Sequence, residues 1–318
     1  MDACTTAEPS PIMAMNRTQP KRPRRCLLSV PGGNSRMLEK ASGIEVDEVF
    51  LDLEDAVAPA AKLDARGMIV EAINKHDWTP KTICVRVNDV ETEYCHDDII
   101  EVVTGARDKL DTIMLTKAKS ASDVMFVHHL LSQLEAKLGI EKRIGIECLI
   151  EEVEGIAHVD EIASASSRLE ALTFGMGDYA ASQKMQLATI GGSGDYPPDI
   201  WHYPRYRMIV ACHANGIDPV DGPYANFADM DSFRTECQRC LTLGMSGKWA
   251  IHPNQVATAM DVFTPDADTV ARARKHEAAY AEALAQGLGA INIDGEMVDA
   301  ATIRIARNVI DRADLYGM

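Results

Sequence analysis

The chain has 318 residues, a formal net charge of -16 at pH 7 and a hydrophobic share of 46%. This size and balance are typical of a globular enzyme with one large α/β domain and a small additional segment. Nucleic-acid binding needs a basic face, and a membrane-spanning helix needs roughly 20 consecutive apolar residues, so we expect neither nucleic acid nor membrane as a partner.

The N-terminal segment has the composition of a loose tail. Residues 1–20 contain no hydrophobic core and no periodic pattern, which argues against a secretory signal peptide. Asp2 and Glu8 lie where mitochondrial presequences avoid acids. We therefore expect residues 1–23 to form a flexible tail.

The eight cysteines are scattered along the chain. Only Cys237 and Cys240 are three residues apart, and no second CxxC pair completes a zinc site. Buried thiols in a reducing compartment are the expected state, which favours a cytoplasmic protein.

Short β-rich runs recur along the chain, with room for one helix between neighbours. The eight runs are 26–30, 48–53, 82–87, 111–116, 143–150, 171–176, 216–221 and 248–253. Segments of helical length lie between them, for example 62–75, 121–138 and 229–243. This alternation predicts an α/β fold, a (β/α)8 TIM barrel over residues 24–262. A doubly wound open sheet is the alternative, but PGGNSR (31–36) does not match its GxGxxG fingerprint.

Residues 263–318 exceed what eight βα units need. Thr264-Pro265-Asp266 predicts the start of a helix that runs to about Gln286. A glycine-rich turn (287–299) and a last helix (299–314) follow. We expect a small C-terminal cap on the barrel or on a neighbouring subunit.

The predicted strands end in polar, charged or Gly/Pro groups. Active sites of such barrels lie at the C-terminal ends of the strands, so all these groups would meet at one rim. The strand ends are Pro31-Gly32-Gly33-Asn34, Asp52-Leu53-Glu54-Asp55, Arg86-Val87-Asn88, Thr116-Lys117, Glu151-Glu152, Gly177-Asp178, Asp221-Gly222 and His252-Pro253. Converging carboxylates repel one another unless a cation lies between them, and oxygen ligands suit Mg2+.

Several of these groups also have structural interpretations. Glu54 and Asp55 can cap the next helix or pair with Lys62, and Arg86 can be an ion-pair partner. Which role each has is open from the residues alone.

The same holds for four further polar residues. Glu147 lies inside the fifth strand, where an acid more often bonds its neighbours, and Asp221 precedes Gly222-Pro223 and can build a turn. His252 can contact a ligand or be structural. Asp178 favours a ligand, because glycines on either side of Met176 allow close approach.

Five motifs resemble the citrate lyase β-subunit-like (HpcH/HpaI aldolase) superfamily. They are LDLEDAVAP (51–59), VRVN (85–88), LIEEVEG (149–155), FGMGDYAAS (174–182) and GKWAIHPNQV (247–256). Within this superfamily, TIGGSGDYPPDIWHYPRYR (189–207) and the DGEMVD segment (294–299) look like the branch of malyl-CoA, β-methylmalyl-CoA and citramalyl-CoA lyases. The resemblance covers roughly residues 24–318.

The resemblance implies an oligomeric, Mg2+-dependent barrel enzyme, commonly a homotrimer or homohexamer. Such enzymes interconvert a 3-hydroxyacyl-CoA with a 2-oxo acid, glyoxylate or pyruvate, and acetyl-CoA or propionyl-CoA. Mn2+ is a possible substitute for Mg2+. A thioesterase acting on malyl-CoA would share this scaffold and is the main alternative. A non-catalytic CoA-binding or RNA-associated protein and an aldolase for free 2-oxo acids are further alternatives.

The resemblance also implies residue roles. Glu151 and Asp178 correspond to the metal ligands, and Arg86 to the catalytic arginine. Asp299 corresponds to a catalytic acid–base expected to reach a neighbouring subunit's site. The positions expected to contact substrate or CoA are Ser29, Val30, Asn34, Arg36, Lys40, Arg86, Gly177, Asp178, Ile251 and His252. Close relatives have arginine where this chain has Asn34, so Asn34 and Arg36 remain alternatives for the CoA phosphate.

A basic cluster near the N-terminus has two interpretations. Lys21, Arg22, Arg24 and Arg25 can help to hold CoA phosphates. For Lys21 and Arg22 a solvated tail is the alternative.

Overall fold

The computed structural model describes residues 20–186 and 199–318. Its centre is a closed barrel of eight parallel strands, in which β1 pairs with both β2 and β8. The strands are β1 (Cys26–Pro31), β2 (Glu48–Asp52), β3 (Thr82–Val87), β4 (Thr112–Leu115), β5 (Gly145–Ile150), β6 (Leu169–Phe174), β7 (Asp218–Asp221) and β8 (Gly247–Ala250). The predicted (β/α)8 barrel is confirmed, and the open sheet is wrong because β8 closes on β1.

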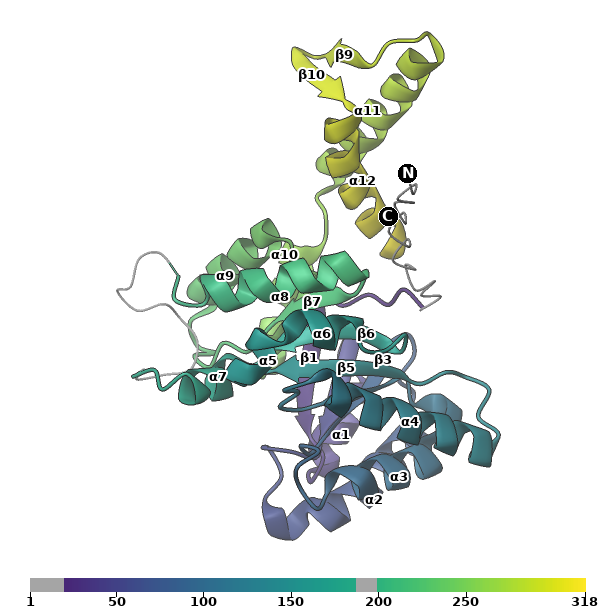
Figure 1. Cartoon of the computed structure of the whole chain (residues 1–318), viewed down its shortest axis with the longest axis vertical. Helices are drawn as coiled ribbons and strands as arrows, with labels where there is room; N and C mark the ends of the chain where they lie inside the picture. The colour runs from purple at the N-terminus through teal and green to yellow at the C-terminus, as the bar shows by residue number, and fades with distance from the viewer. Residues whose placement is uncertain (1–19, 187–198) are drawn as a thin grey trace, which may run out of the picture.

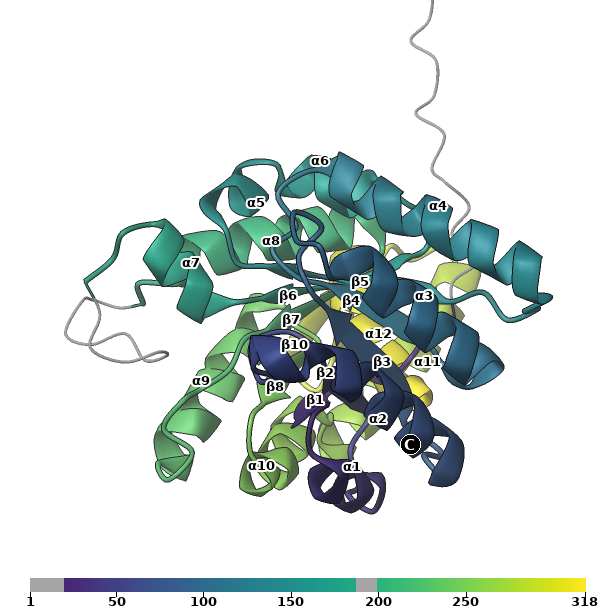
Figure 2. The ribbon, with the colours of Figure 1, turned by 90° about the horizontal axis from the view of Figure 1, so that it is seen from below.

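Helices surround these strands, as Figure 2 shows. They are α1 (Ser35–Ser42), α2 (Lys62–Lys75), α3 (Cys95–Ala106), α4 (Ala121–Leu138), α5 (Val153–Ala157), α6 (Val159–Ser164), α7 (Met176–Ser182), α8 (His202–Asn215), α9 (Met230–Leu243) and α10 (Pro253–Phe263). Short 3-10 turns lie at Pro59–Ala61 and Arg107–Lys109. None of the helices in the described ranges is long and apolar enough to cross a membrane.

Local sequence sets the ends of these helices. Ser120 and Asp123 form a capping box that starts α4, and Gly139, with φ of +65°, ends it. Gly216 ends α8 in the same left-handed conformation. These start and end signals explain why the predicted helix 121–138 coincides with α4.

An apolar layer divides the barrel interior. Seven strands each contribute one buried residue to it: Leu27, Phe50, Cys84, Met114, Leu149, Val220 and Trp249. The rings of Phe50 and Trp249 meet edge to face at 5.0 Å between centroids. The layer separates charged residues at the N-terminal ends of the strands from the rim at their C-terminal ends.

The C-terminal segment contains a β-hairpin that the sequence interpretation missed. α11 (Ala267–Ala285) and α12 (Ala300–Leu315) flank the antiparallel strands β9 (Ala290–Ile293) and β10 (Glu296–Asp299). The turn residues Asp294 and Gly295 have φ of +53° and +92°. Asp-Gly is a strong signal for a two-residue hairpin turn, so this stretch is more ordered than the expected turn.

This segment stands away from the barrel, with the hairpin at its far end (Figure 1). It contacts the barrel near the N-terminal ends of the strands. Arg25, which directly precedes β1, donates to Thr264 Oγ1 at 3.0 Å and lies 4.3 Å from the ring centroid of Tyr316. Arg312 in α12 donates to the Met245 carbonyl, just before β8. The segment is thus anchored at the end of the barrel opposite the rim.

Candidate active site

Arg86 and Asp52 form the base of the rim. They are register partners on β3 and β2, and Arg86 Nε and Nη2 lie 2.7 and 2.6 Å from the two Asp52 carboxylate oxygens. The Arg86 guanidinium lies 5.6 and 5.3 Å from the ring centroids of Phe50 and Trp249. Burial lowers the pKa of Arg86, but Asp52 and Glu54 more than compensate and raise it above its usual value. A charged arginine is therefore fixed at the strand ends.

Glu54 joins this pair to a lysine. Its Oε2 lies 3.2 Å from Arg86 Nη1, and its Oε1 lies 2.6 Å from Lys117 Nζ. Lys62 donates to the backbone carbonyls of Leu53 and Glu54 at 2.8 and 2.9 Å. Lys62 thus fixes the loop after β2, while the Glu54 carboxylate is directed to the rim.

Glu151 and Asp178, the predicted metal ligands, face the same lysine. Lys117 Nζ lies 3.9 Å from Glu151 Oε1 and 3.7 Å from Asp178 Oδ2. The backbone N–H of Lys117 also donates to Glu151 Oε1 at 3.1 Å. Glu151 is buried, whereas 40% of the Asp178 side chain is exposed. The structure therefore brings both predicted ligands to one point beside Glu54.

The electrostatics at this point favour a cation. Burial raises the pKa of Glu151 well above its usual value; Lys117 and Arg86 oppose this shift, and Asp178 and Glu54 add to it. A divalent ion between Glu151 and Asp178 would offset the cost of burying this charge. Two carboxylates, with further positions left for water and substrate, are the donor set that Mg2+ prefers. The residues present therefore fit Mg2+.

A glycine makes room for Glu151. A Cβ on Gly175 would lie 2.5 Å from both the Cβ and the Oε2 of Glu151. Gly175 follows β6 and is the N-cap of α7, so it brings the start of that helix against the end of β5. Gly177 and Asp178 lie in the first turn of α7. This close approach is the physical reason for a glycine at position 175.

A cavity of about 250 Å3 lies beside the rim between β1, α1 and the end of β8. It is lined by Leu28, Ser29, Val30, Pro31, Met37, Lys40, Ala41, Ile44, Ile251, His252 and Pro253. Five positions predicted to contact CoA (Ser29, Val30, Lys40, Ile251 and His252) therefore line one cavity. Its wall is mostly apolar, with Lys40 as the cation, and the His252 ring stacks on Phe227 at 4.7 Å.

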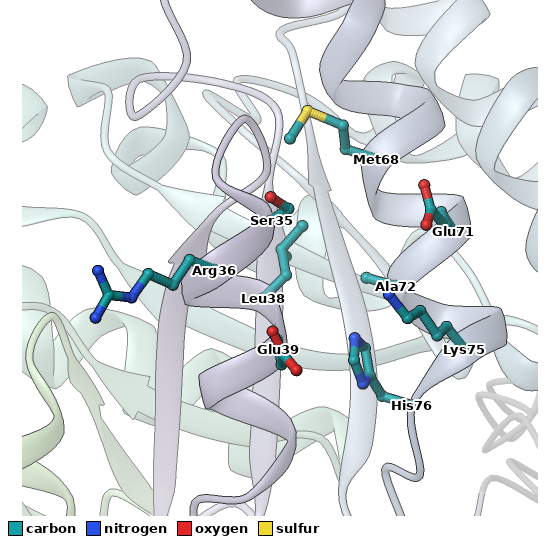
Figure 3. A pocket seen from close by; sticks show the side chains of 9 residues that line it. All are labelled: Ser35, Arg36, Leu38, Glu39, Met68, Glu71, Ala72, Lys75 and His76. Carbon is teal, nitrogen blue, oxygen red and sulfur yellow. The ribbon is translucent and has the colours of Figure 1, made fainter.

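Asn34 and Arg36 do not line this cavity. Asn34 is the N-cap of α1, and its Oδ1 accepts the backbone N–H of Met37 at 3.1 Å. Arg36 borders a larger groove of about 420 Å3 between α1 and α2. In Figure 3 the Arg36 side chain projects away from the other labelled residues. Neither side chain therefore belongs to the wall of the cavity that Ser29, Lys40 and His252 share.

Asp299 lies far from this rim, at the end of β10. Its Oδ1 accepts the backbone N–H groups of Ala301 and Thr302 at 3.0 Å each and caps α12. These hydrogen bonds, together with the Thr302 hydroxyl, lower the pKa of Asp299 below its usual value. Because the cap is anchored at the opposite end of the barrel, Asp299 does not reach its own rim.

Asp52 and Lys117 are the rim residues to which sequence reasoning assigned no role. Both belong to the strand ends expected at the rim, so their position was predicted. Their partners were not, because the Asp52–Arg86 pair depends on the register of β2 against β3. The contacts of Lys117 depend on its left-handed backbone, with φ of +49°.

A second buried charged cluster lies at the other end of the barrel. Arg24 Nη2 lies 3.1 Å from Glu147 Oε1 and 2.6 Å from Glu170 Oε2. Ligand atoms of Glu48, Cys84 and Glu147 lie within 4.8 Å of one another, a spacing compatible with a metal ion. Arg24 already supplies a positive charge there, and burial raises the pKa of Glu48 well above its usual value. We therefore assign this cluster a structural role, in line with the structural interpretation of Glu147.

The other basic residues near the N-terminus also lie at this end. Arg22 pairs with Asp111 at 2.8 Å, and Arg25 pairs with Asp47 at 2.6 Å. Their position does not support the expectation that the cluster holds CoA phosphates at the rim.

Asp221 is a buried ion-pair residue and not only a turn residue. Its Oδ1 lies 2.8 Å from Arg205 Nε, and Lys248 donates to its Oδ2. These contacts link β7, β8 and α8. Burial would raise the pKa of Asp221, but Arg205 and Lys248 lower it below its usual value. Asp221 is thus a structural anchor.

Comparison with known proteins places the chain in one family. Residues 25–253 match the family described as HpcH/HpaI aldolase/citrate lyase. The chain is 43% identical over 306 residues to an L-malyl-CoA/beta-methylmalyl-CoA lyase of Cereibacter sphaeroides, covering 93% of this chain and 96% of that protein. It is 32% identical over 297 residues to a (3S)-malyl-CoA thioesterase of the same species, covering 92% and 95%.

A solved structure shows the same architecture. The crystal structure of CitE from Mycobacterium tuberculosis, in complex with magnesium, acetoacetate and coenzyme A, has a TM-score of 0.71 and 25% sequence identity. The alignment covers 91% of this chain and 97% of that one. Part of the predicted branch-specific motif, residues 189–198, lies outside the described residues. From the family match and the relatives, this chain belongs to the HpcH/HpaI aldolase/citrate lyase family.

Proposed function

We propose that this protein is a carbon–carbon lyase that reversibly cleaves a 3-hydroxyacyl-CoA in a Mg2+-dependent reaction. The substrates would be malyl-CoA, β-methylmalyl-CoA or citramalyl-CoA, and the products glyoxylate or pyruvate together with acetyl-CoA or propionyl-CoA. One observation carries the proposal: Arg86, Glu54, Glu151 and Asp178 lie around one point of the rim, beside a cavity lined by five of the expected CoA-contacting residues. The relative at 43% identity is named an L-malyl-CoA/beta-methylmalyl-CoA lyase, which supports the lyase activity.

Glu151 and Asp178 are the residues that would hold the metal. When bound, Mg2+ supplies Lewis-acid stabilisation and orients the two-carbon fragment. Arg86, fixed by Asp52, presents positive charge to the oxygen that becomes negative as the carbon–carbon bond breaks. The apolar layer beneath it limits water from the barrel interior.

The cavity beside the rim is the proposed entrance of the acyl-CoA. Its apolar wall suits the pantetheine arm, and Lys40 suits a phosphate. Gly177, beside the ligand Asp178, leaves space for the acyl group close to the backbone.

Asp299 is the proposed acid–base. In the synthetic direction it would take a proton from the methyl group of acetyl-CoA, and in cleavage it would return that proton to the enolate. Because Asp299 does not reach its own rim, we propose that residues 263–318 form a cap that serves the barrel (24–262) of a second copy. Large apolar side chains exposed on the cap, such as Met297 at 71% and Ile305 at 68%, are consistent with a homotrimer or homohexamer.

We also propose a cytoplasmic setting. The described cysteines, Cys26, Cys84, Cys95, Cys148, Cys212, Cys237 and Cys240, are free and buried, a state that a reducing compartment maintains. Mn2+ prefers similar oxygen ligands and is expected to substitute for Mg2+. Adding either ion back to EDTA-treated protein, with glyoxylate formation as the readout, checks the substitution.

The test is incubation of the purified protein with malyl-CoA and Mg2+, with glyoxylate trapped as a hydrazone. We expect glyoxylate and acetyl-CoA that disappear with EDTA and fall sharply in Asp299→Asn. The relative named as a thioesterase makes hydrolysis the alternative. Malate and free CoA without glyoxylate would support that alternative and exclude the lyase.

A further inference from the structure

The ammonium of Lys117 lies among three carboxylates of the rim. We propose that Lys117 is the charge-balancing cation of the metal site: it neutralises Glu54, limits how tightly a divalent ion is held, and leaves the metal-loaded rim neutral for an anionic oxo acid. This inference rests on the proposed function, because it concerns the same rim. It assigns Lys117 the role of a positioning residue that acts through charge.

The backbone aims this side chain at the rim. Lys117 follows β4 with φ of +49°, a left-handed conformation that is unfavourable for residues with a Cβ. Thr116 fixes the strand end by donating to the Val87 carbonyl at 3.1 Å, and the Lys117 N–H donates to Glu151. The strained turn thus directs the ammonium inward instead of into solvent.

The distances distinguish one hydrogen-bond partner from two ion-pair neighbours. Lys117 Nζ lies 2.6 Å from Glu54 Oε1, which is a short charge-assisted hydrogen bond. Its separations from Asp178 and Glu151, 3.7 and 3.9 Å, exceed hydrogen-bond length. Glu54 therefore accepts the hydrogen bond of the Lys117 ammonium. The ammonium makes no hydrogen bond to Glu151 or Asp178, whose carboxylates can still bind a metal ion.

The charges of the rim balance only when Lys117 is included. The described carboxylates there are Asp52, Glu54, Glu151 and Asp178, and the cations in contact with them are Arg86 and Lys117. With all of them ionised, a divalent ion brings the net charge to zero. Without Lys117 the loaded rim would keep one negative charge, which attracts the metal ion and repels a substrate carboxylate.

The experiment uses Lys117→Met in the full-length protein, because methionine keeps the Cβ and much of the side-chain length. Calorimetric titration of MgCl2 into EDTA-treated protein is expected to show a dissociation constant at least about tenfold lower than that of the wild type. Titration of glyoxylate into Mg2+-saturated protein is expected to show binding at least about tenfold weaker. The opposite directions are the signature of a charge-balancing role.

Two variants serve as controls. Lys117→Arg keeps the positive charge, so the electrostatic effect on both constants should remain and each should stay within about threefold of the wild type. Lys119→Met removes a lysine two residues away, whose ammonium lies 2.7 Å from Glu91, and should leave both unchanged. Thermal unfolding confirms that each variant is folded.

The possible results separate the two proposals. Weaker or unchanged Mg2+ binding in folded Lys117→Met, or both constants moving in the same direction, overturns the role of Lys117. A wild type that binds Mg2+ and glyoxylate but cleaves no acyl-CoA overturns the proposed function alone, since both titrations need no turnover. A wild type that binds no Mg2+ overturns both.

Discussion

Gly175 and Glu151 approach so closely that a Cβ on the glycine would lie 2.5 Å from the Cβ and Oε2 of the glutamate. The end of β6 is therefore packed directly against the predicted metal ligand at the end of β5. The two strand ends form one rigid unit, in which the position of a carboxylate depends on the absence of a side chain on the adjacent strand.

Gly175→Ala should displace Glu151, because the new methyl group would lie 2.5 Å from the Cβ and Oε2 of its side chain. We expect Mg2+ affinity to fall at least about tenfold and the free energy of unfolding to fall by about 1–3 kcal/mol. Calorimetry and urea unfolding measure the two effects. Gly67→Ala is the matched control, since no atom lies within 4 Å of its added Cβ and helix propensity favours alanine. Unchanged Mg2+ affinity in Gly175→Ala would show that Glu151 is not the ligand.

Asp52→Asn should disorder Arg86, because it removes the charge from a buried bidentate pair. We expect the free energy of unfolding to fall by about 3 kcal/mol and kcat to fall roughly a hundredfold. Urea unfolding and glyoxylate release measure these quantities. Asp55→Asn, at an exposed position three residues away, should change neither. Equal effects in both variants would contradict a specific role for Asp52.

A site shared between subunits predicts complementation between two inactive variants. Arg86→Ala lacks the rim arginine and Asp299→Asn lacks the acid–base, so each alone should be nearly inactive. When equal amounts are unfolded and reassembled together, about a quarter of the sites would combine an intact rim with an intact Asp299. Glyoxylate formation should therefore recover to about a quarter of the wild-type rate. No recovery, in a mixed oligomer of wild-type mass, would rule out a shared site.

The buried Glu48 predicts a pH-dependent stability. Burial raises the pKa of Glu48 in the folded protein above the unfolded value of about 4.3. The contribution of Glu48 to the free energy of unfolding is therefore fully present below that pH, and it is lost as the pH rises towards the folded-state pKa. Glu48→Gln removes this titration. As the pH rises, the free energy of unfolding of the variant should therefore increase relative to that of the wild type, by up to about 1.4 kcal/mol per pH unit.

Urea unfolding over a pH series that starts at about pH 5 measures this difference. Glu45→Gln, at a nearby exposed position, is the control and should follow the wild-type curve. Parallel curves for Glu48→Gln and the wild type would mean that Glu48 is ionised in the folded protein.

The sequence by itself determined the barrel and the location of the rim. Strand and helix periodicities are local properties, and parallel strands must end at the same edge, so Arg86, Glu151 and Asp178 were predicted to converge. The family resemblance grouped Ser29 with His252 as expected CoA contacts, and both line one cavity although they lie at opposite ends of the barrel sequence.

Only the tertiary structure decided which charges pair. The Asp52–Arg86 pair depends on strand register, and the place of Lys117 depends on a left-handed backbone that sequence patterns do not reveal. The direction of the cap was likewise decided by contacts of Arg25 and Tyr316, which put Asp299 out of reach of its own rim. Long-range packing sets these choices once the barrel closes, because each depends on two segments that are distant in sequence.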